Sequence, residues 1–179
     1  MCKVIFCRTL APMDRDFEIA RRTEELVLGL GTNVGDKSRN LSIAIRKLEE
    51  VFGPVVDVSR VYLTAPWGKT DQDDFLNQVA VFETNIRPSI ALDTIMQIEE
   101  EMGRVRFEKW GPRLIDIDIL LYGQIVYQSD LLQIPHPYIQ DRVFVLDPLA
   151  EIRPDFNHPL HEKSVRTLLQ ELQQRDEQK

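Results

Sequence analysis

The sequence predicts an α+β fold with a ferredoxin-like βαββαβ core, in which a mainly antiparallel sheet carries helices on one face and extra helices follow at the C-terminal end. Two observations support this prediction. Strand-like and helix-like apolar patterns follow each other as strand, helix, strand, strand, helix, strand from residue 26 to residue 121. The chain has 179 residues and is 43% apolar, which suits one domain with a substantial core. In this plan the other face of the sheet is left for a ligand.

A first strand is predicted over residues 26–30, and it runs into a turn that contains Gly29, Gly31 and Gly35. The spacing fits neither a dinucleotide-binding fingerprint nor a phosphate-binding P-loop. The third glycine comes one position late for the fingerprint, and Asp36 stands where the P-loop requires lysine. These glycines are therefore interpreted as a tight turn that leads into a helix.

The middle of the core is predicted from periodicity and from stop signals. A helix is expected over residues 38–52, before Gly53-Pro54, and a strand over residues 55–64. After a polar loop at 65–73, a second strand covers residues 75–84 and a second helix covers residues 88–102.

The last core strand is expected over residues 114–121, which are almost continuously apolar apart from two acids. A short added strand is predicted at 125–127. Amphipathic or apolar helices are predicted at 143–152 and 164–173, and they supply the extra C-terminal helices.

The two acids of the central strand are Asp116 and Asp118. Alternate strand residues point to the same face, so both carboxylates share one face, with Cα atoms roughly 6.5 Å apart. Solvated acids on an exposed face are the ordinary alternative. An apolar strand is a buried one, however, and buried carboxylates need a cation or a basic partner. The pair therefore predicts a site for Mg²⁺, which binds one or two carboxylates together with substrate phosphates.

A basic loop precedes this strand and contains Arg104, Arg106, Lys109 and Arg113. The whole chain has 22 basic and 29 acidic residues, so this concentration is local. Guanidinium groups grip phosphate oxygens in bidentate fashion. Basic residues beside paired acids therefore predict a polyphosphate substrate bound with a metal ion.

Four residues leave two interpretations open. Trp67 lies in a polar loop and is either packed or a lid over a flat ligand. Asn77 stands on an apolar strand face, so its amide pairs either with backbone or with a heterocycle. Glu99, on the inward stripe of a helix, either pairs with the arginines or contacts ligand. His136, between Pro135 and Pro137, is either packed or held toward a ligand.

Composition narrows the class of protein and its partners. A net charge of −7 argues against nucleic-acid binding as the main activity. No apolar stretch approaches the ~20 residues of a membrane span, so no membrane partner is expected. Cys2 and Cys7 are the only cysteines, which favours a reducing, cytoplasmic location. Residues 1–25 are expected to be an N-terminal arm of unknown role, residues 26–172 the domain, and residues 173–179 a polar tail.

Several short motifs occur together in this chain. They are Leu28-Gly29-Leu30-Gly31-Thr32-Asn33, Thr64-Ala65-Pro66-Trp67-Gly68, Phe75-Leu76-Asn77, Gly103-Arg104-Val105-Arg106, Trp110-Gly111-Pro112-Arg113, Asp116-Ile117-Asp118, Pro135-His136-Pro137 and Arg142-Val143-Phe144-Val145-Leu146. Over roughly residues 26–172 they resemble the 6-hydroxymethyl-7,8-dihydropterin pyrophosphokinase family of folate biosynthesis. The succession R-x-R, W-G-P-R, D-x-D is far more specific than any one of its parts.

The resemblance implies transfer of the β,γ-diphosphate of ATP to the hydroxymethyl oxygen of the pterin, with release of AMP. It implies two Mg²⁺ ions on Asp116 and Asp118, and catalytic contacts of Arg104 and Arg113 with the transferring diphosphate. The residues implied to bind ATP, the co-substrate, are Glu99, Arg106, Lys109, Arg113, Ile119, His136 and Arg142. Those implied to bind the pterin are Thr64, Ala65, Trp67, Phe75, Asn77, Trp110 and Phe144. Enzymes of this pathway are sometimes fused, so fusion to or association with other folate enzymes is a further expectation.

The chain departs from the family pattern at a few positions. The basic loop is short between Arg106 and Trp110, Ala65 replaces a frequent proline, Lys109 replaces a usual arginine, and Tyr138 replaces a frequent basic residue. None of these positions belongs to the acid pair.

Two other classes of protein share part of this pattern. The first is a different metal-dependent nucleotidyl or phosphoryl transferase, which would release other products than AMP. The second is an RNA-binding module of the same architecture. It would show an aromatic RNP1-like run, and the sequence has none.

Overall fold

The computed structural model describes residues 22–66, 71–104 and 111–178. Its main sheet has the order β2-β4-β1-β5, and β3 also pairs with β4. Every pairing in it is antiparallel. The strands are β1 (Glu24–Thr32), β2 (Val55–Val58), β3 (Tyr62–Thr64), β4 (Phe75–Thr84) and β5 (Asp116–Tyr122). With its two helices this order confirms the predicted ferredoxin-like βαββαβ core.

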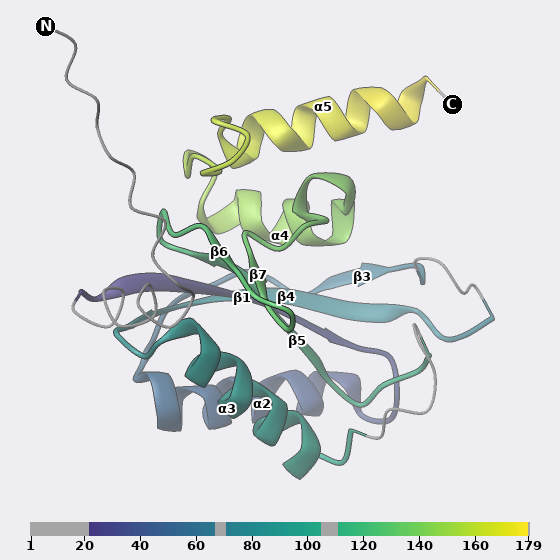
Figure 1. Cartoon of the computed structure of the whole chain (residues 1–179). Coiled ribbons are helices and arrows are strands. Elements are labelled where there is room, and N and C mark those ends of the chain that lie inside the picture. The colour runs from purple at the N-terminus through teal and green to yellow at the C-terminus, as the bar shows by residue number, and fades with distance from the viewer. Residues whose placement is uncertain (1–21, 67–70, 105–110, 179) are drawn as a thin grey trace, which may run out of the picture.

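Two helices cover one face of the sheet, α2 (Lys37–Phe52) and α3 (Pro88–Glu101) (Figure 1). Asp36 begins α2 by accepting a hydrogen bond from the Arg39 N–H, and Gly53 ends it with φ 89°. The buried residues of α2, which are Leu41, Ala44, Leu48 and Phe52, pack against inward-facing residues of β1 and β5 in the larger apolar core. This layer buries the apolar face that the sequence assigns to each strand.

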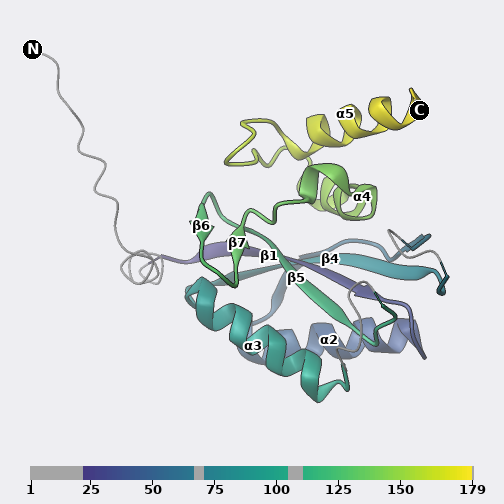
Figure 2. The same ribbon diagram turned by 45° about the vertical axis from the view of Figure 1, so that its right-hand side comes forward.

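The opposite face is only partly open, because a second helical layer lies on it (Figure 2). It consists of α4 (Val143–Ile152) and α5 (Val165–Glu177), with the short 3-10 helix η1 (Ile139–Asp141) before α4. A separate core forms there from Val27, Val79, Val81, Leu120, Leu121, Ile139, Val145, Leu146, Leu149, Val165, Leu168 and Leu172. The ligand face predicted from the sequence is therefore a cleft beside α4 and not an uncovered sheet.

Two small strands, β6 (Tyr127–Gln128) and β7 (Gln133–Ile134), form a separate two-stranded sheet near the predicted 125–127 strand. The chain then returns to β5, where the His136 N–H donates to the Leu120 carbonyl at 2.9 Å. The connection thus anchors His136 beside the strand that carries the acids.

Two sequence predictions need correction. The strand predicted over residues 55–64 is broken into β2 and β3, because Ser59 at the break bonds β4 through its N–H and its hydroxyl in place of a regular ladder. Gly29 and Gly31 lie within β1 and not in a turn; Gly35, with φ 68°, is the glycine of the turn. Both corrections place more residues beside the cleft.

The ends of the described chain also differ in detail from the expected divisions. β1 already begins at Glu24, and α5 continues to Glu177, past residue 173. Among the described residues, no helix combines the length and the apolar character that crossing a bilayer requires.

Candidate active site

The candidate active site is a cleft of about 280 Å³ between the sheet and α4. Its floor comes from the middle of the sheet, its mouth from the segment around Arg113, and one wall from the first turn of α4. Its lining includes Gly29, Gly31, Thr64, Ala65, Phe75, Asn77, Arg104, Arg113, Asp116, Asp118, Arg142 and Phe144. The structure therefore brings together most of the sequence-predicted catalytic and pterin residues that it describes.

Asp116 and Asp118 lie on the cleft face of β5, whereas Ile117 and Ile119 point into the helix-covered core. The alternation predicted from the sequence is thus observed. In the ladder with β1, Gly31 pairs with Asp116 and Gly29 with Asp118. Directly paired residues share one face of a sheet, and glycine has no side chain, so the two acids stand over an open floor.

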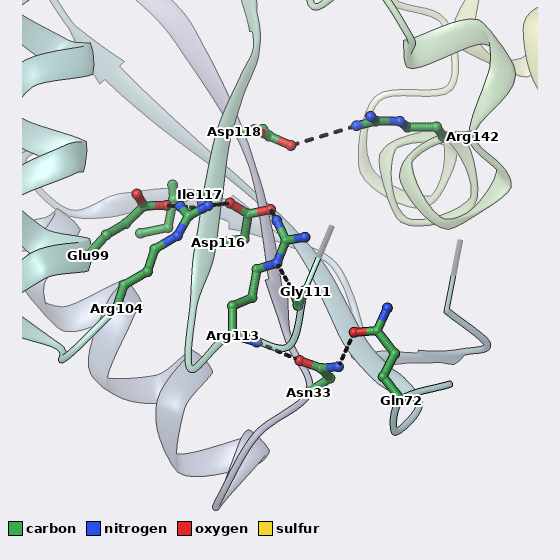
Figure 3. A network of polar contacts seen from close by, with 10 residues as sticks. All are labelled: Asn33, Gln72, Glu99, Arg104, Gly111, Arg113, Asp116, Ile117, Asp118 and Arg142. Atoms are coloured by element: carbon green, nitrogen blue, oxygen red, sulfur yellow. Dashed lines mark hydrogen bonds and ion pairs between the residues drawn. The ribbon is translucent and has the colours of Figure 1, made fainter. Parts of the chain in front are cut away.

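Asp116 is held between two guanidinium groups (Figure 3). Arg104 Nη2 lies 2.6 Å from Asp116 Oδ1, and Arg113 Nη1 forms an ion pair with Asp116 Oδ2. The three side chains are mostly buried, so this contact is better shielded from water than a surface ion pair. The fold thus places two arginines at the first acid.

Glu99, at the end of α3, is 3% exposed and is the second partner of Arg104. Its Oε1 also accepts a hydrogen bond from the Ile117 N–H at 2.7 Å. Burial raises the pKa of Glu99, while Arg104 acts against this shift. Glu99 therefore pairs with an arginine, which is one of the two interpretations left open, and Figure 3 shows it on the side of β5 away from Arg142.

Asp118 stands apart from these pairs. Its nearest cationic partner among the described side chains is Arg142, whose Nη1 lies 3.8 Å from Asp118 Oδ2. Burial in the cleft, together with the charge of Asp116, raises the pKa of Asp118 to about 7. Since 42% of the side chain is still exposed, an ion can reach it from the cleft.

The acid pair fits a divalent ion that shares its ligands with a substrate. The described residues contain no cluster of three or more histidine, cysteine or acidic side chains suited to a metal. A structural zinc site with four protein ligands is therefore not formed by this part of the chain. Mg²⁺ needs only one or two carboxylates when phosphates and water complete its shell, and Asp116 and Asp118 offer that.

Arg142 is the N-cap of α4 and lies next to two aromatic rings. Its guanidinium carbon is 5.2 Å from the centroid of Tyr138 and 5.7 Å from that of Phe144. These contacts fix the side chain at the cleft, beside Asp118. Tyr138, the departure from the family pattern, thus contributes a ring to this arrangement.

Asn77 and Thr64 meet at the floor of the cleft, on neighbouring strands β4 and β3. Asn77 Nδ2 donates to Thr64 Oγ1 at 2.7 Å. The Asn77 amide thus donates to a side-chain hydroxyl and not to backbone, which was one of the two expected pairings. The pairing with a heterocycle stays a prediction. Nearby, the Arg113 guanidinium lies 5.9 Å from the Phe75 ring centroid.

Asn33 is a functional position for which the sequence reasoning assigned no role. It is 2% exposed, and its Oδ1 accepts from the Arg113 N–H at 2.8 Å. Its Nδ2 donates to Gln72 Oε1 at 3.0 Å and to the Asp73 carbonyl at 3.3 Å. One buried amide therefore links β1 to the loops on both sides of the cleft mouth (Figure 3). The sequence feature that could have indicated this role is an asparagine directly after a buried strand.

The predicted ATP residues are divided. His136 lies beside β5 but does not line the cleft, and its Nδ1 accepts from the Tyr138 N–H at 3.2 Å. Burial and the charge of Arg142 lower the pKa of His136 to about 4. The side chain of Ile119 lies in the core, so a contact with ATP there would need main-chain atoms. Arg106, Lys109, Trp67 and Trp110 lie outside the described residues.

Comparisons with known proteins agree with this geometry. A family model described as 7,8-dihydro-6-hydroxymethylpterin-pyrophosphokinase (HPPK) matches residues 27–154. The chain is 45% identical over 139 residues to the 2-amino-4-hydroxy-6-hydroxymethyldihydropteridine pyrophosphokinase of Aquifex aeolicus, and the match covers 78% of this chain and 86% of the relative. It is 46% identical over 129 residues to the protein of the same name from Methylorubrum extorquens, with 72% and 82% covered.

Other similar proteins are longer. The folic acid synthesis protein fol1 of Schizosaccharomyces pombe is 42% identical over 146 residues, and the match covers 81% of this chain but 20% of that protein. A crystal structure of HPPK-DHPS in complex with substrates superposes with a TM-score of 0.70 at 16% identity, covering 88% of this chain and 45% of the other. Wild-type HPPK-DHPS of Plasmodium falciparum superposes with a TM-score of 0.68 at 20% identity, covering 86% of this chain and 42% of the other. At these identities the solved structures confirm the fold, and the chain spans less than half of each.

Proposed function

We propose that this chain, which belongs to the 7,8-dihydro-6-hydroxymethylpterin-pyrophosphokinase family, carries out its reaction in the cleft over β5. The reaction transfers the pyrophosphate of ATP to hydroxymethyldihydropterin in folate biosynthesis. The observation that carries the proposal is the acid pair on a glycine floor, with Arg104, Arg113 and Arg142 around it.

We assign Asp116 and Asp118 to two Mg²⁺ ions. The raised pKa of Asp118 supports this assignment, since two carboxylates on one strand face repel each other and a cation between them relieves that repulsion. When bound, paired ions neutralise phosphate charge and orient the attacking oxygen of an in-line displacement. The protein's own part is to hold both carboxylates on one rigid strand.

Arg104 and Arg113 exchange partners in this proposal. Without ligand they neutralise Asp116. A triphosphate carries more negative charge and offers more acceptor oxygens than one carboxylate, so the guanidinium groups turn to the transferring diphosphate when ATP binds. Asp116 is then free to bind metal. Catalysis follows from positioning and charge stabilisation of the transferring group.

We also assign ATP contacts to Arg142 and His136. Arg142 lies at Asp118, and His136 is neutral at pH 7 because its pKa is lowered to about 4. Since His136 Nδ1 accepts from the Tyr138 N–H, the ring proton lies on Nε2, which can donate to a phosphate oxygen. The remaining assigned ATP residues are Glu99, Arg106, Lys109, Arg113 and Ile119.

The pterin is assigned to the floor between β3 and α4. Asn77 and Thr64 supply donors and acceptors for the edge of the heterocycle, and Phe144 supplies a ring face for stacking. The pterin would replace the Asn77–Thr64 hydrogen bond with its own, so the amide stays satisfied in both states. Ala65, Trp67, Phe75 and Trp110 complete the assigned pterin residues.

One assay tests the function and its ion requirement. AMP is quantified from ATP with and without hydroxymethyldihydropterin, over a series of Mg²⁺ concentrations. The proposal expects AMP only when the pterin is present, and a dependence on Mg²⁺ that requires more than one ion. ADP as the product, or an undiminished rate after chelation, would contradict it.

A single-turnover experiment tests the exchange of partners. Arg113→Ala should slow the chemical step more than it weakens pterin binding, because the contact is made with the transferring diphosphate. Arg166→Ala, in an exposed pair with Asp155 on α5, is the matched control. A purely binding defect in Arg113→Ala would remove the assigned role.

We extend the proposal to partners and compartment. The longer folic acid synthesis protein that contains a similar domain supports fusion to, or association with, other folate enzymes. The low cysteine count supports a cytoplasmic location.

A further inference from the structure

The two walls of the assigned pterin slot come from separate elements, β3 and α4. Thr64 and Ala65 line the cleft from the end of β3, and Phe144 and Val145 line it from the first turn of α4. Figure 1 shows α4 lying over the β4 and β3 side of the sheet. The distance between these elements sets the width of the slot.

A second contact joins the same two elements about two helical turns away. Glu151, near the end of α4, accepts from the Tyr62 hydroxyl at 2.9 Å and from the Arg60 N–H at 3.2 Å, both through Oε2. Its Oε1 accepts from Arg60 Nε at 3.0 Å. A single carboxylate on α4 thus holds the segment that begins β3.

The geometry makes the two contacts a matched pair. Phe144 and Glu151 are seven positions apart and share one face of α4, separated by about 10.5 Å of rise. Tyr62 and Thr64 are two positions apart and share one face of β3. The same faces of α4 and β3 therefore lie opposite each other at two places, at the Glu151–Tyr62 contact and on the two sides of the slot.

The contact is not an ordinary surface ion pair. Arg60 is 78% exposed, so its side-chain part contributes little. The Tyr62 hydroxyl and the Arg60 main-chain N–H are better held, because Tyr62 lies in β3 and Arg60 stands two residues before it. Partial burial works to raise the pKa of Glu151, but the hydrogen bonds from Tyr62 and Arg60 outweigh it and lower the pKa. The carboxylate is therefore charged at neutral pH.

We propose that Glu151 is a positioning residue for the pterin, acting through Tyr62 to hold β3 at the distance from α4 that lets the heterocycle fit between Thr64 and Phe144. The inference rests on the proposed assignment of the pterin to this slot. It does not involve Asp116 and Asp118 of β5, to which the metal ions are assigned.

The test compares binding of the two substrates in three variants. Glu151→Ala removes every bond to the segment, Tyr62→Phe removes only the hydroxyl, and Glu151→Gln keeps an acceptor for the Tyr62 hydroxyl and the Arg60 N–H. We expect KM for the pterin to rise about tenfold in Glu151→Ala and severalfold in Tyr62→Phe, with KM for ATP within twofold of wild type. Glu151→Gln should restore pterin KM to near the wild-type value.

Glu171→Ala is the control, because Glu171 forms a comparable exposed pair with Lys163 on α5, away from the cleft. It should leave both KM values unchanged. Equal rises in both KM values, a fall in kcat alone, or no recovery in Glu151→Gln would overturn the positioning role. If Glu151→Ala does not fold, Tyr62→Phe decides by the same criteria.

The same experiment tests the proposed function separately. Wild-type protein that forms AMP only with pterin, and loses this activity in Asp118→Asn, retains its assignment even if Glu151 proves to be without effect. Wild-type protein that forms no AMP would remove the premise instead.

Discussion

The two faces of β5 are built from the same seven-residue strand yet serve different purposes. Ile117 and Ile119 face α2 and α3 in the larger core, and Asp116 and Asp118 face the cleft. The neighbouring strand repeats this division, because Leu30 and Leu28 pair with the isoleucines, and Gly31 and Gly29 pair with the acids. Each face of β5 therefore has its own kind of neighbour on β1, leucine on the core face and glycine on the cleft face.

The difference teaches how one strand can be both rigid and reactive. On the core face, large side chains interdigitate and keep the backbone in place. On the cleft face, glycines remove bulk, and the acids are balanced by arginines and not by packing. Substitutions on the two faces should therefore separate stability from activity, and the following predictions test this division.

The largest effect is expected on the cleft face. Asp116→Asn and Asp118→Asn should each lower kcat by about 10³-fold, because each removes a charge that holds metal against the transferring phosphates. Both should remain folded, as circular dichroism can show. The control is Asp155→Asn, which removes an acid from an exposed pair on the other side of α4. Near-normal AMP formation by both active-site variants would end the metal assignment.

The next effect belongs to the core face. Ile117→Ala should lower the free energy of unfolding by about 3 kcal/mol, since it leaves a cavity under the helices. kcat should stay within a fewfold of wild type at temperatures where the variant is folded. Urea denaturation measures the first quantity and the AMP assay the second. Val58→Ala, at an exposed strand position, should change neither. A loss of activity as large as that of Asp118→Asn would mean that the faces are not separable.

A smaller effect is expected for bulk added to the cleft floor. A Cβ on Gly31 would lie 3.0 Å from Asn77 Oδ1, and Asn77 is held by Thr64. Gly31→Ala should therefore weaken pterin binding about tenfold, on the scale of an added methyl group in a fitted pocket. Gly29→Ala is the comparison variant, because its Cβ would lie 3.2 Å from Leu120 Cδ1 and would not approach Asn77. Titration with pterin and a non-hydrolysable ATP analogue compares the two, and equal affinities would contradict the prediction.

The smallest effect concerns pH. The pKa of Asp118 is about 7 in the folded chain and near 3.8 when unfolded, so the folded state binds more protons between these values. Stability without metal should therefore fall as pH rises from 4 through 7. Asp118→Asn avoids this loss and should be more stable than wild type at pH 8, by on the order of 1 kcal/mol after allowing for solvent screening in the cleft. At pH 4 the two proteins should have the same melting temperature. A difference in stability that stays constant between pH 4 and pH 8 would exclude the linkage.

Much of the fold could be predicted because local pattern and tertiary environment agree. The alternation of β5 requires one apolar and one acidic face, and the strand at 75–84 and the helix at 143–152 match β4 and α4. The pairing of Glu99 with an arginine was one of the two interpretations that an acid on an apolar stripe next to a basic loop left open.

Other features depend on contacts between distant residues and were not predicted. The break between β2 and β3 requires Ser59 to bond β4, and the cover of α4 on the ligand face requires the second core. Asn33 links loops that are about 40 and 80 residues away, and Glu151 meets a tyrosine 89 positions earlier. No periodicity in a single segment encodes such pairs.

The central place of β1 also bears on how the chain is made. Ribosomes synthesise this strand before its two neighbours, β4 and β5, which are complete only at Thr84 and Tyr122. At about 5–20 residues per second, the nascent chain waits about 5–20 s between finishing β1 and finishing β5. During that interval β1 has no partner strand on at least one edge, so its apolar side chains stay open to non-native contacts until β5 is made.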